Sequence, residues 1–276
     1  MTVATDVART NLLRLRSARA YIFDMDGVLY RGNAPLPGVA ELFAALQLRG
    51  IPYRLATNNS TLTPHQYVEK LAGMGIAITA DHIVTSGTAT RKYLENRFPL
   101  GSKVYVIGEP ALSHQLFVSN HLMAAAHGEG PVTAVVVGLD REFTYAKLYA
   151  ANAAIRNGAA FIATNADVTL PTEVGLVPGC GSIVAAIAAS AGQQPDIVGK
   201  PGGLLFEIAS EHMGVSISDT VAIGDRLDTD IVAANTAGAL SLMVLTGVST
   251  RDDIAAFPEK PDLVFTDLNA VLDAIA

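Results

Sequence analysis

Short apolar runs alternate with longer stretches of mixed polarity along most of the chain. Apolar runs bounded by polar residues or glycine are typical of buried strands. The chain has such runs at residues 21–23, 53–56, 82–85, 220–223, 241–246 and 262–265. Helix-length stretches follow several of them, at 38–49, 64–74 and 201–213. This alternation predicts an α/β protein with a doubly wound, Rossmann-like parallel sheet built from βαβ units.

The same rhythm continues through the middle of the chain, where further strands are expected at 103–107, 132–138 and 159–163, with a helix at 143–157. We expect residues 87–195 to form a smaller α/β domain of their own, inserted into a core domain made of residues 1–86 and 196–276. An insertion of this kind can cover a site on the core and exclude water during a reaction.

Composition and charge argue against two classes of binding partner. Half of the 276 residues are hydrophobic, yet no apolar run approaches the roughly 18 residues that a membrane span requires. The formal charge of −7 and the isoelectric point near 5.3 argue against general nucleic-acid binding. We therefore expect neither a membrane nor a nucleic-acid partner, and a cytoplasmic location is the default.

The N-terminal residues and the single cysteine add two local expectations. The first 20 residues are rich in arginine but lack the continuous apolar core of a secretion signal. A transit peptide is the alternative, but Asp6 and the scarcity of serine favour a short surface helix before the first strand. Cys180 is the only cysteine, which excludes an internal disulfide, and the glycines beside it predict a tight loop.

Polar clusters follow three of the expected core strands. The first strand runs into Asp24-Met25-Asp26-Gly27, the second into Thr57-Asn58-Asn59-Ser60, and a later one into Gly224-Asp225 with Asp228 and Asp230 close behind. Because the carboxyl ends of parallel strands meet at one edge of a sheet, we expect a shared site there, joined by Lys200 of the segment Gly199-Lys200-Pro201. A strand followed by an ordinary Asp-Gly turn would, taken alone, give much the same letters as the first cluster.

This set of side chains suits phosphoryl transfer. Carboxylates bind Mg²⁺, a hard cation that proteins usually hold through one or two acids, substrate phosphate and water. A lysine and loop N–H groups neutralise phosphate oxygens, and positioning with electrostatic stabilisation then supplies most of the catalysis.

The order of the motifs carries a family resemblance. DMDGVLY (24–30), TNNS (57–60), GKP (199–201) and GDRLDTDI (224–231) resemble the four motifs of the haloacid dehalogenase superfamily, and the second Asp of the first motif is that of its phosphatase branch. The insertion between the second and third motifs, with VVGLDREFTY (136–145) and TNAD (164–167), is similar to the α/β cap of the NagD-like, or p-nitrophenylphosphatase-like, subgroup.

The resemblance implies a role for each site residue. Asp24 would be the nucleophile that forms an aspartyl-phosphate, and Asp26 the general acid and then the general base. Phosphate would be bound by Thr57, Asn58, Asn59 and Lys200, although helix capping would also account for Asn59. Mg²⁺ would be held by Asp24, Asp225 and the backbone carbonyl of Asp26. Asp230 would orient a metal-bound water or a neighbouring group, and Asp228 is left outside the site because a helix N-terminal acid has the same pattern.

The substrate is expected to be a small phosphorylated metabolite chosen by the cap. Asn165, Asp167 and Leu170 are candidate specificity residues. Leu170-Pro171 looks closer to phosphoglycolate and glycerol-phosphate phosphatases than to pyridoxal-phosphate phosphatases, which carry a His near Leu170. Glycerol 3-phosphate or phosphoglycolate is thus expected, with a nucleotide or sugar phosphate as alternatives. A phosphotransferase or mutase using the same Asp24 intermediate, a ligand-binding protein without catalysis, and a homodimer by analogy also stay open.

Overall fold

A computed structural model describes residues 2–126, 128–172 and 175–276. The chain divides into two compact units. The core unit comprises the chain up to Thr57, Pro64–Val84 and Lys200–Ala276, and the insert unit comprises Asn58–Thr63 and Thr85–Gly199. The loop 58–63 therefore belongs with the insert unit, although the sequence analysis had placed it in the core domain. The boundaries expected at 86/87 and 195/196 stay a prediction.

The core unit is built on a six-stranded sheet with the order β15-β14-β13-β1-β4-β5. Its strands are β1 (Ala20–Phe23), β4 (Tyr53–Thr57), β5 (Ile83–Thr85), β13 (Thr220–Gly224), β14 (Leu240–Val244) and β15 (Leu263–Phe265). The central strand β1 is fully buried and pairs in parallel with β13 and with β4. Phe23 lies opposite Ile223 on one side and Leu55 on the other, so the residues that follow all three strands emerge level at one edge.

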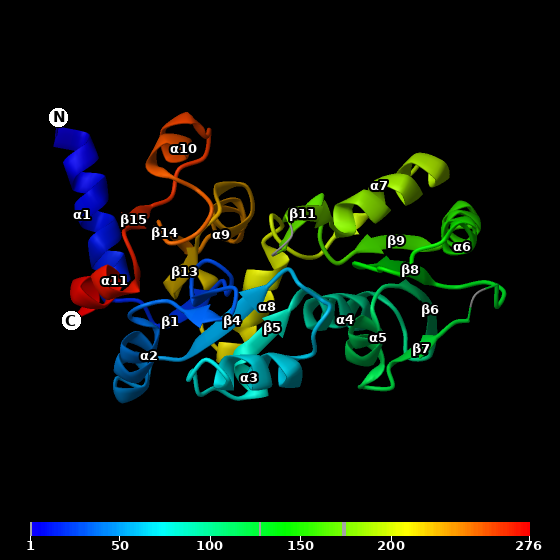
Figure 1. Cartoon of the computed structure of the whole chain (residues 1–276), viewed down its shortest axis with the longest axis horizontal. Helices are drawn as coiled ribbons and strands as arrows, with labels where there is room; N and C mark the ends of the chain where they lie inside the picture. Colours follow the sequence, from blue (N-terminus) through cyan, green and yellow to red (C-terminus); the bar gives the residue numbers. More distant parts are fainter. Residues whose placement is uncertain (1, 127, 173–174) are drawn as a thin grey trace. The chain divides into compact units, whose positions relative to one another are not determined.

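Helices and short elements complete the core unit. They are α1 (Thr2–Arg16), α2 (Val39–Leu48), α3 (Pro64–Ala72), α8 (Leu204–Met213), α9 (Val232–Ala237), α10 (Arg251–Ala256), α11 (Leu268–Ile275), the 3₁₀ turns η1 (Ala80–His82) and η2 (Ile217–Asp219), the π-helical turn η3 (Leu227–Ile231) and the hairpin β2 (Tyr30–Arg31)/β3 (Ala34–Pro35). Aromatic packing joins α2 to the sheet, because Phe43 stacks on Tyr53 and meets Phe23 edge-on. The predicted N-terminal helix is confirmed, and it lies beside α11, where Arg16 Nε donates to the carbonyl of Ala274 (Figure 1).

The insert unit has its own parallel sheet, with the order β12-β9-β8-β6-β7. Its strands are β6 (Ser102–Ile107), β7 (Leu122–Ala124), β8 (Ala134–Val137), β9 (Ala160–Ala163) and β12 (Asp196–Ile197), its helices are α4 (Ser86–Arg97), α5 (Pro110–Phe117), α6 (Tyr145–Arg156) and α7 (Cys180–Ala191), and β10 (Thr169–Thr172) and β11 (Gly175–Pro178) form a hairpin. One face of this sheet packs on α6 and α7 through a core that includes Val135, Phe161, Ile155 and Ile187. The predicted parallel α/β architecture with a separate inserted α/β sheet is confirmed.

The loop predicted around Cys180 is wrong. Cys180 is the first residue of α7 and is buried, and burial raises the pKa of its thiol to about 11. The neighbouring glycines serve close packing: a Cβ on Gly179 would lie 2.3 Å from the carbonyl oxygen of Asp167, and one on Gly181 would lie 2.3 Å from that of Ala166. Glycine is therefore needed here because the first turn of α7 packs closely against the backbone of residues 166 and 167. In the sequence, glycines with this role are indistinguishable from glycines of a turn.

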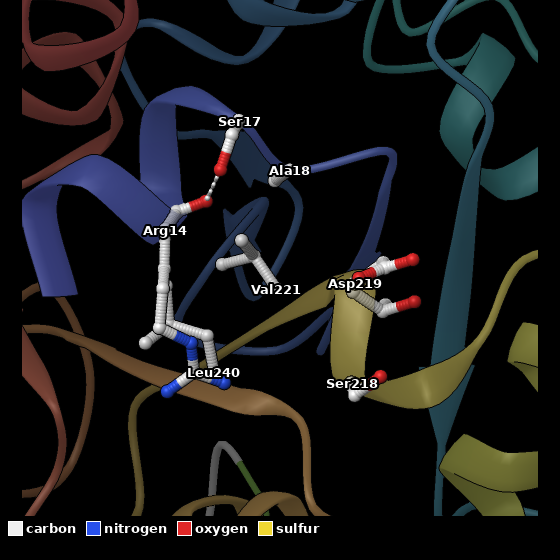
Figure 2. Close-up of a pocket in the computed structure, with 8 residues that line it drawn as sticks. Arg14, Ser17, Ala18, Ser218, Asp219, Val221 and Leu240 are labelled. Carbon is white, nitrogen blue, oxygen red and sulfur yellow. Dashed lines mark hydrogen bonds between the residues drawn. The ribbon is translucent and has the colours of Figure 1, made fainter. Parts of the chain in front are cut away.

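A pocket of about 150 Å³ lies at the amino ends of the core strands, at the end of the sheet opposite the polar clusters. Its lining includes Arg14, Asp219, Val221 and Leu240 (Figure 2). In open α/β sheets, ligands bind beyond the carboxyl ends of the strands. This pocket lies at the opposite end, so we do not count it as a candidate active site. Among the described helices, none is both long enough and apolar enough to cross a membrane.

Candidate active site

Three carboxylates converge at the carboxyl edge of the core sheet. Asp24 follows β1, Asp225 follows β13, and Asp230 lies in η3. One oxygen of each lies within 4.8 Å of the others, and the residues are only 9%, 2% and 3% exposed. Burial of three acids together is costly unless cations compensate their charge. The parallel register thus produces the shared site that the spacing of the motifs predicts.

Lys200 provides one of the compensating charges. Its ammonium donates to Asp24 Oδ1 at 2.5 Å, to Asp230 Oδ1 at 2.7 Å and to the carbonyl oxygen of Ala56 at 3.3 Å. Burial on its own would lower the pKa of Lys200, but the charges of Asp230 and Asp24 outweigh it and hold that pKa above its ordinary value. Lys200 is therefore a buried cation that restrains two carboxylates.

Asp230 supports this arrangement through both of its oxygens. Oδ1 accepts from Lys200, and Oδ2 accepts from the backbone N–H groups of Asp225 at 3.2 Å and Arg226 at 3.1 Å. A side chain at Gly224 would displace it, since a Cβ there would lie 2.1 Å from the Cβ of Asp230. Asp228, in contrast, is exposed and pairs with Arg226 at 2.9 Å.

A loop after β14, which was not among the predicted site residues, packs on Asp225. The N–H of Val248 donates to Asp225 Oδ2 at 2.8 Å, and the N–H of Ser249 donates to the Asp225 carbonyl at 3.1 Å. A Cβ on Gly247 would lie 1.8 Å from Asp225 Oδ2, so only glycine leaves room for this carboxylate. The available signal was a fourth strand end with a polar cluster, Thr246-Gly247-Val248-Ser249.

The site carries more negative than positive charge. Burial, with the neighbouring acids, raises the pKa of Asp24 to about 7 and that of Asp225 to about 8, although Lys200 opposes the shift. Three carboxylates face one ammonium, so the site favours binding of further positive charge. Closely spaced carboxylate oxygens are the ligands that a hard divalent cation such as Mg²⁺ prefers, and the donor set fits that ion. Asp24 and Asp225 are the better candidates for direct contact, since both oxygens of Asp230 are engaged.

Asp26 stands apart from these three acids. Its residue is exposed, yet partial burial of the carboxyl raises its pKa, and the charges of Lys70 and Arg31 oppose that rise. Lys70 lies over the ring of Tyr30, with Nζ 4.2 Å from the ring centre. Lys70 and Arg31 were not predicted as part of the site, because their only local signal is charge on a helix and on a short strand.

The second motif spans the two units. Thr57 is buried at the end of β4, where its side chain hydrogen bonds with Tyr67 of α3, a residue that the sequence analysis did not identify. Asn59 Oδ1 accepts from the N–H and the hydroxyl of Thr61, at 2.8 and 2.7 Å, so its side chain organises the local turn before α3. Asn58 belongs to the insert unit.

The three predicted specificity residues lie in or just before the hairpin of the insert unit. Asn165 and Asp167 follow β9, and both hydrogen bond with Asn58. Leu170 is half-buried in β10 and lies opposite Val177 of β11. The structure therefore groups Asn165 and Asp167 with the second motif.

Comparison with known proteins identifies the family of this chain. A protein-family model described as haloacid dehalogenase-like hydrolase matches residues 21–120, and a second model of the same kind matches 197–271. An acid sugar phosphatase of Staphylococcus saprophyticus is 38% identical over 258 residues, which cover 94% of this chain and 98% of that protein. The crystal structure of 4-nitrophenylphosphatase from Thermotoga maritima superposes with a TM-score of 0.89 at 36% identity, covering 95% of this chain and 99% of the other.

A further solved structure, the glycerol phosphate phosphatase of Mycobacterium tuberculosis in complex with magnesium, gives a TM-score of 0.86 at 33% identity and covers 94% of this chain and 77% of the other. The fold and the carboxylate site define a hydrolase with a haloacid dehalogenase-type core. The chain belongs to the haloacid dehalogenase-like hydrolases, among the phosphatases of the NagD and p-nitrophenylphosphatase type.

Proposed function

We propose that this chain is a Mg²⁺-dependent phosphomonoesterase that hydrolyses small phosphorylated metabolites through an aspartyl-phosphate on Asp24. The observation that carries the proposal is the buried cluster of Asp24, Asp225 and Asp230 around Lys200. A cluster with this excess of negative charge suits a site completed by a divalent cation and a phosphate.

Asp24, Asp225 and the backbone carbonyl of Asp26 would hold the metal. When bound, Mg²⁺ would neutralise the carboxylates and polarise the phosphoryl oxygens. Around it, the hydroxyl of Thr57, the N–H groups of Asn58 and Asn59, and Lys200 would bind the phosphate. Lys200 would at the same time keep the Asp24 carboxylate in position for attack.

In the first step a carboxylate oxygen of Asp24 attacks phosphorus, and the bond from phosphorus to the alcohol oxygen breaks. Asp26 gives its proton to the departing alkoxide, so the alcohol leaves neutral. In the second step Asp26, now a carboxylate, takes a proton from water as that water attacks the aspartyl-phosphate. Inorganic phosphate leaves, and Asp24 and Asp26 return to their starting states. The raised pKa of Asp26 favours the protonated form that the first step needs.

The names of two relatives support the proposed substrate class. One relative is named acid sugar phosphatase and another glycerol phosphate phosphatase, so we place sugar phosphates and glycerol 3-phosphate first, with phosphoglycolate beside them. Leu170 would contribute an apolar contact to the choice of substrate.

The test is phosphate release from p-nitrophenyl phosphate, sugar phosphates, glycerol 3-phosphate, phosphoglycolate and nucleoside monophosphates, with Mg²⁺ or EDTA. Asp24→Asn should reduce turnover by at least about 10⁴-fold. Asp228→Asn is the matched control, because it removes an exposed carboxylate near the same edge. Folded wild-type protein that releases no phosphate from any substrate would contradict the proposal, and transfer to an added acceptor alcohol in place of water would indicate a phosphotransferase.

A further inference from the structure

The chain crosses between the two units beside two of the proposed phosphate-binding residues. Thr57 ends one segment of the core unit and Asn58 begins the insert unit, while Gly199 ends the insert unit and Lys200 returns to the core unit. Within the insert unit, Asn58 and Gly199 are both held by the four residues that follow β9, Thr164–Asp167, here called the clasp.

The clasp holds Asn58 through two hydrogen bonds. Asn165 Nδ2 donates to the Asn58 carbonyl at 2.8 Å, and Asn58 Nδ2 donates to Asp167 Oδ2 at 3.1 Å. The two clasp side chains are fixed relative to one another, because Asn165 Oδ1 accepts from the N–H of Asp167 at 3.1 Å. Ser86 adds a further donor to the Asn58 carbonyl at 2.5 Å. Asn165 is only 6% exposed, so its amide is enclosed with the partners it contacts.

The clasp also holds Gly199. The N–H of Gly199 donates to the carbonyl of Thr164 at 2.9 Å. A Cβ on Gly199 would lie 2.4 Å from that same oxygen and 2.5 Å from Asn58 Oδ1. Asn58 and Gly199, at two of the four crossings between the units, therefore lie in direct contact with the clasp, and only glycine at 199 allows so close an approach.

The rest of the loop after Asn58 is held by a different side chain. Gln115 Nε2 donates to the carbonyls of Ser60 and Leu62, each at 3.3 Å, and its Oε1 accepts from the Thr85 hydroxyl. Gln115 is buried. The loop is thus fastened to the insert unit along its length, and the clasp is the part that fixes its first residue.

We propose that Asn165 and Asp167 are positioning residues, which hold the backbone of Asn58 so that the phosphate-binding loop and the start of the Lys200 segment keep their places. The inference rests on the proposed function. It assigns these residues a role different from substrate selection, because their polar groups contact Asn58. A small misplacement of binding groups costs much of the benefit of orientation, so loss of one clasp bond should weaken phosphate binding for every substrate alike.

The experiment compares Asn165→Ala and Asp167→Leu with the conservative Asp167→Asn, which keeps an acceptor oxygen. Asn96→Ala, an exposed asparagine of α4, is the matched control. Two readouts are taken with Mg²⁺ present: kcat/KM for p-nitrophenyl phosphate, glycerol 3-phosphate and a sugar phosphate, and the Kd of inorganic phosphate by calorimetry. We expect kcat/KM to fall about tenfold for all substrates, with their ratios unchanged within about twofold, and the phosphate Kd to rise about tenfold. Asp167→Asn and Asn96→Ala should stay close to wild type.

A changed order of substrates with an unchanged phosphate Kd would overturn the proposal in favour of direct substrate selection. Lower activity in proportion to the folded fraction, again with an unchanged Kd, would also overturn it, since that is the result of a purely structural role. If wild type binds phosphate but hydrolyses nothing, the proposed function fails. The phosphate Kd of the variants then still tests whether Asn165 and Asp167 position the phosphate-binding loop. Wild type that neither hydrolyses nor binds phosphate overturns both.

Discussion

The two sheets of this protein are alike in architecture and differ in the charge at their carboxyl ends. In the core unit, three buried carboxylates face a single ammonium, that of Lys200. At the corresponding edge of the insert unit, two acids have cationic partners: Asp140 pairs with Lys147 at 2.7 Å, and Glu109 pairs with Arg141 at 2.9 Å. Both edges carry polar residues because both are strand ends of an open parallel sheet. What distinguishes a site for chemistry is therefore buried charge that the protein alone leaves uncompensated.

The largest expected effect comes from removal of the buried ammonium in the core unit. Lys200→Met leaves Asp24 and Asp230 without their shared cation, and loss of one partner from a buried pair typically costs about 3–5 kcal/mol of unfolding free energy. Activity should fall about 10³-fold, because the proposed phosphate contact is lost as well. Denaturant unfolding and phosphate release measure the two effects.

Lys147→Met is the matched change in the insert unit. Asp140 is buried but Lys147 is partly exposed, so we expect a loss of about 1 kcal/mol and little change in kcat. Equal losses of unfolding free energy in Lys200→Met and Lys147→Met would contradict the proposed difference in charge between the two sheet edges.

The second effect is the dependence of stability on pH and Mg²⁺. The pKa values of Asp24 and Asp225 are raised to about 7 and about 8 in the folded protein, above their ordinary value of 3.8. Between pH 4 and pH 8 the folded protein therefore holds more protons than the unfolded chain, so without a divalent cation stability should fall as pH rises.

Mg²⁺ favours the ionised carboxylates and should stabilise more at pH 8.5 than at pH 5.5. Thermal unfolding in EDTA and in Mg²⁺ at both pH values should reveal a gap in Tm that widens by about 5 °C at the higher pH. A gap that is the same at both values would contradict the assignment of the metal to these two acids.

A smaller effect is expected at the loop that packs on Asp225. Gly247→Ala would place a methyl group 1.8 Å from Asp225 Oδ2, which must then move. We expect the Mg²⁺ concentration for half-maximal activity to rise about tenfold. Gly73→Ala is the control, because its methyl group would lie 3.3 Å from the Lys70 carbonyl oxygen, a mild crowding compared with 1.8 Å at Gly247. An unchanged Mg²⁺ requirement in Gly247→Ala would separate this loop from the metal site.

The smallest effect is expected where an acid of the same motif lies outside the buried cluster. Asp228 is exposed and pairs with Arg226, so Asp228→Asn should change kcat/KM by less than about twofold and the unfolding free energy by less than about 0.5 kcal/mol. Asp230→Asn, measured beside it, should be far more damaging, because the amide loses the negative charge that pairs with Lys200 and has one acceptor oxygen where Asp230 uses two. Similar losses in both variants would mean that burial does not separate the two acids.

The sequence by itself determined the architecture and the chemical character of the core edge. Runs such as residues 21–23 and 220–223 are apolar because a central parallel strand is buried on both faces, and this requirement is readable locally. The acids Asp24 and Asp225 follow those strands directly, so their meeting was predictable from the rule that parallel strands end together. The roles assigned to them stay a proposal.

Only the tertiary structure decided how these groups are held. The bond from Asn58 to Asp167 joins residues 109 positions apart, and Gly247 leaves space for an acid in a different strand-end loop. Cys180 begins a helix although its glycine neighbours predict a turn. Glycine is needed on either side of it because the chain there packs against backbone atoms of residues 166 and 167. Local patterns record burial and chain direction, whereas contacts between distant segments arise only when the sheets are assembled. The fold and the meeting of these acids at one edge of the core sheet were thus visible in the sequence, and the contacts that position them were not.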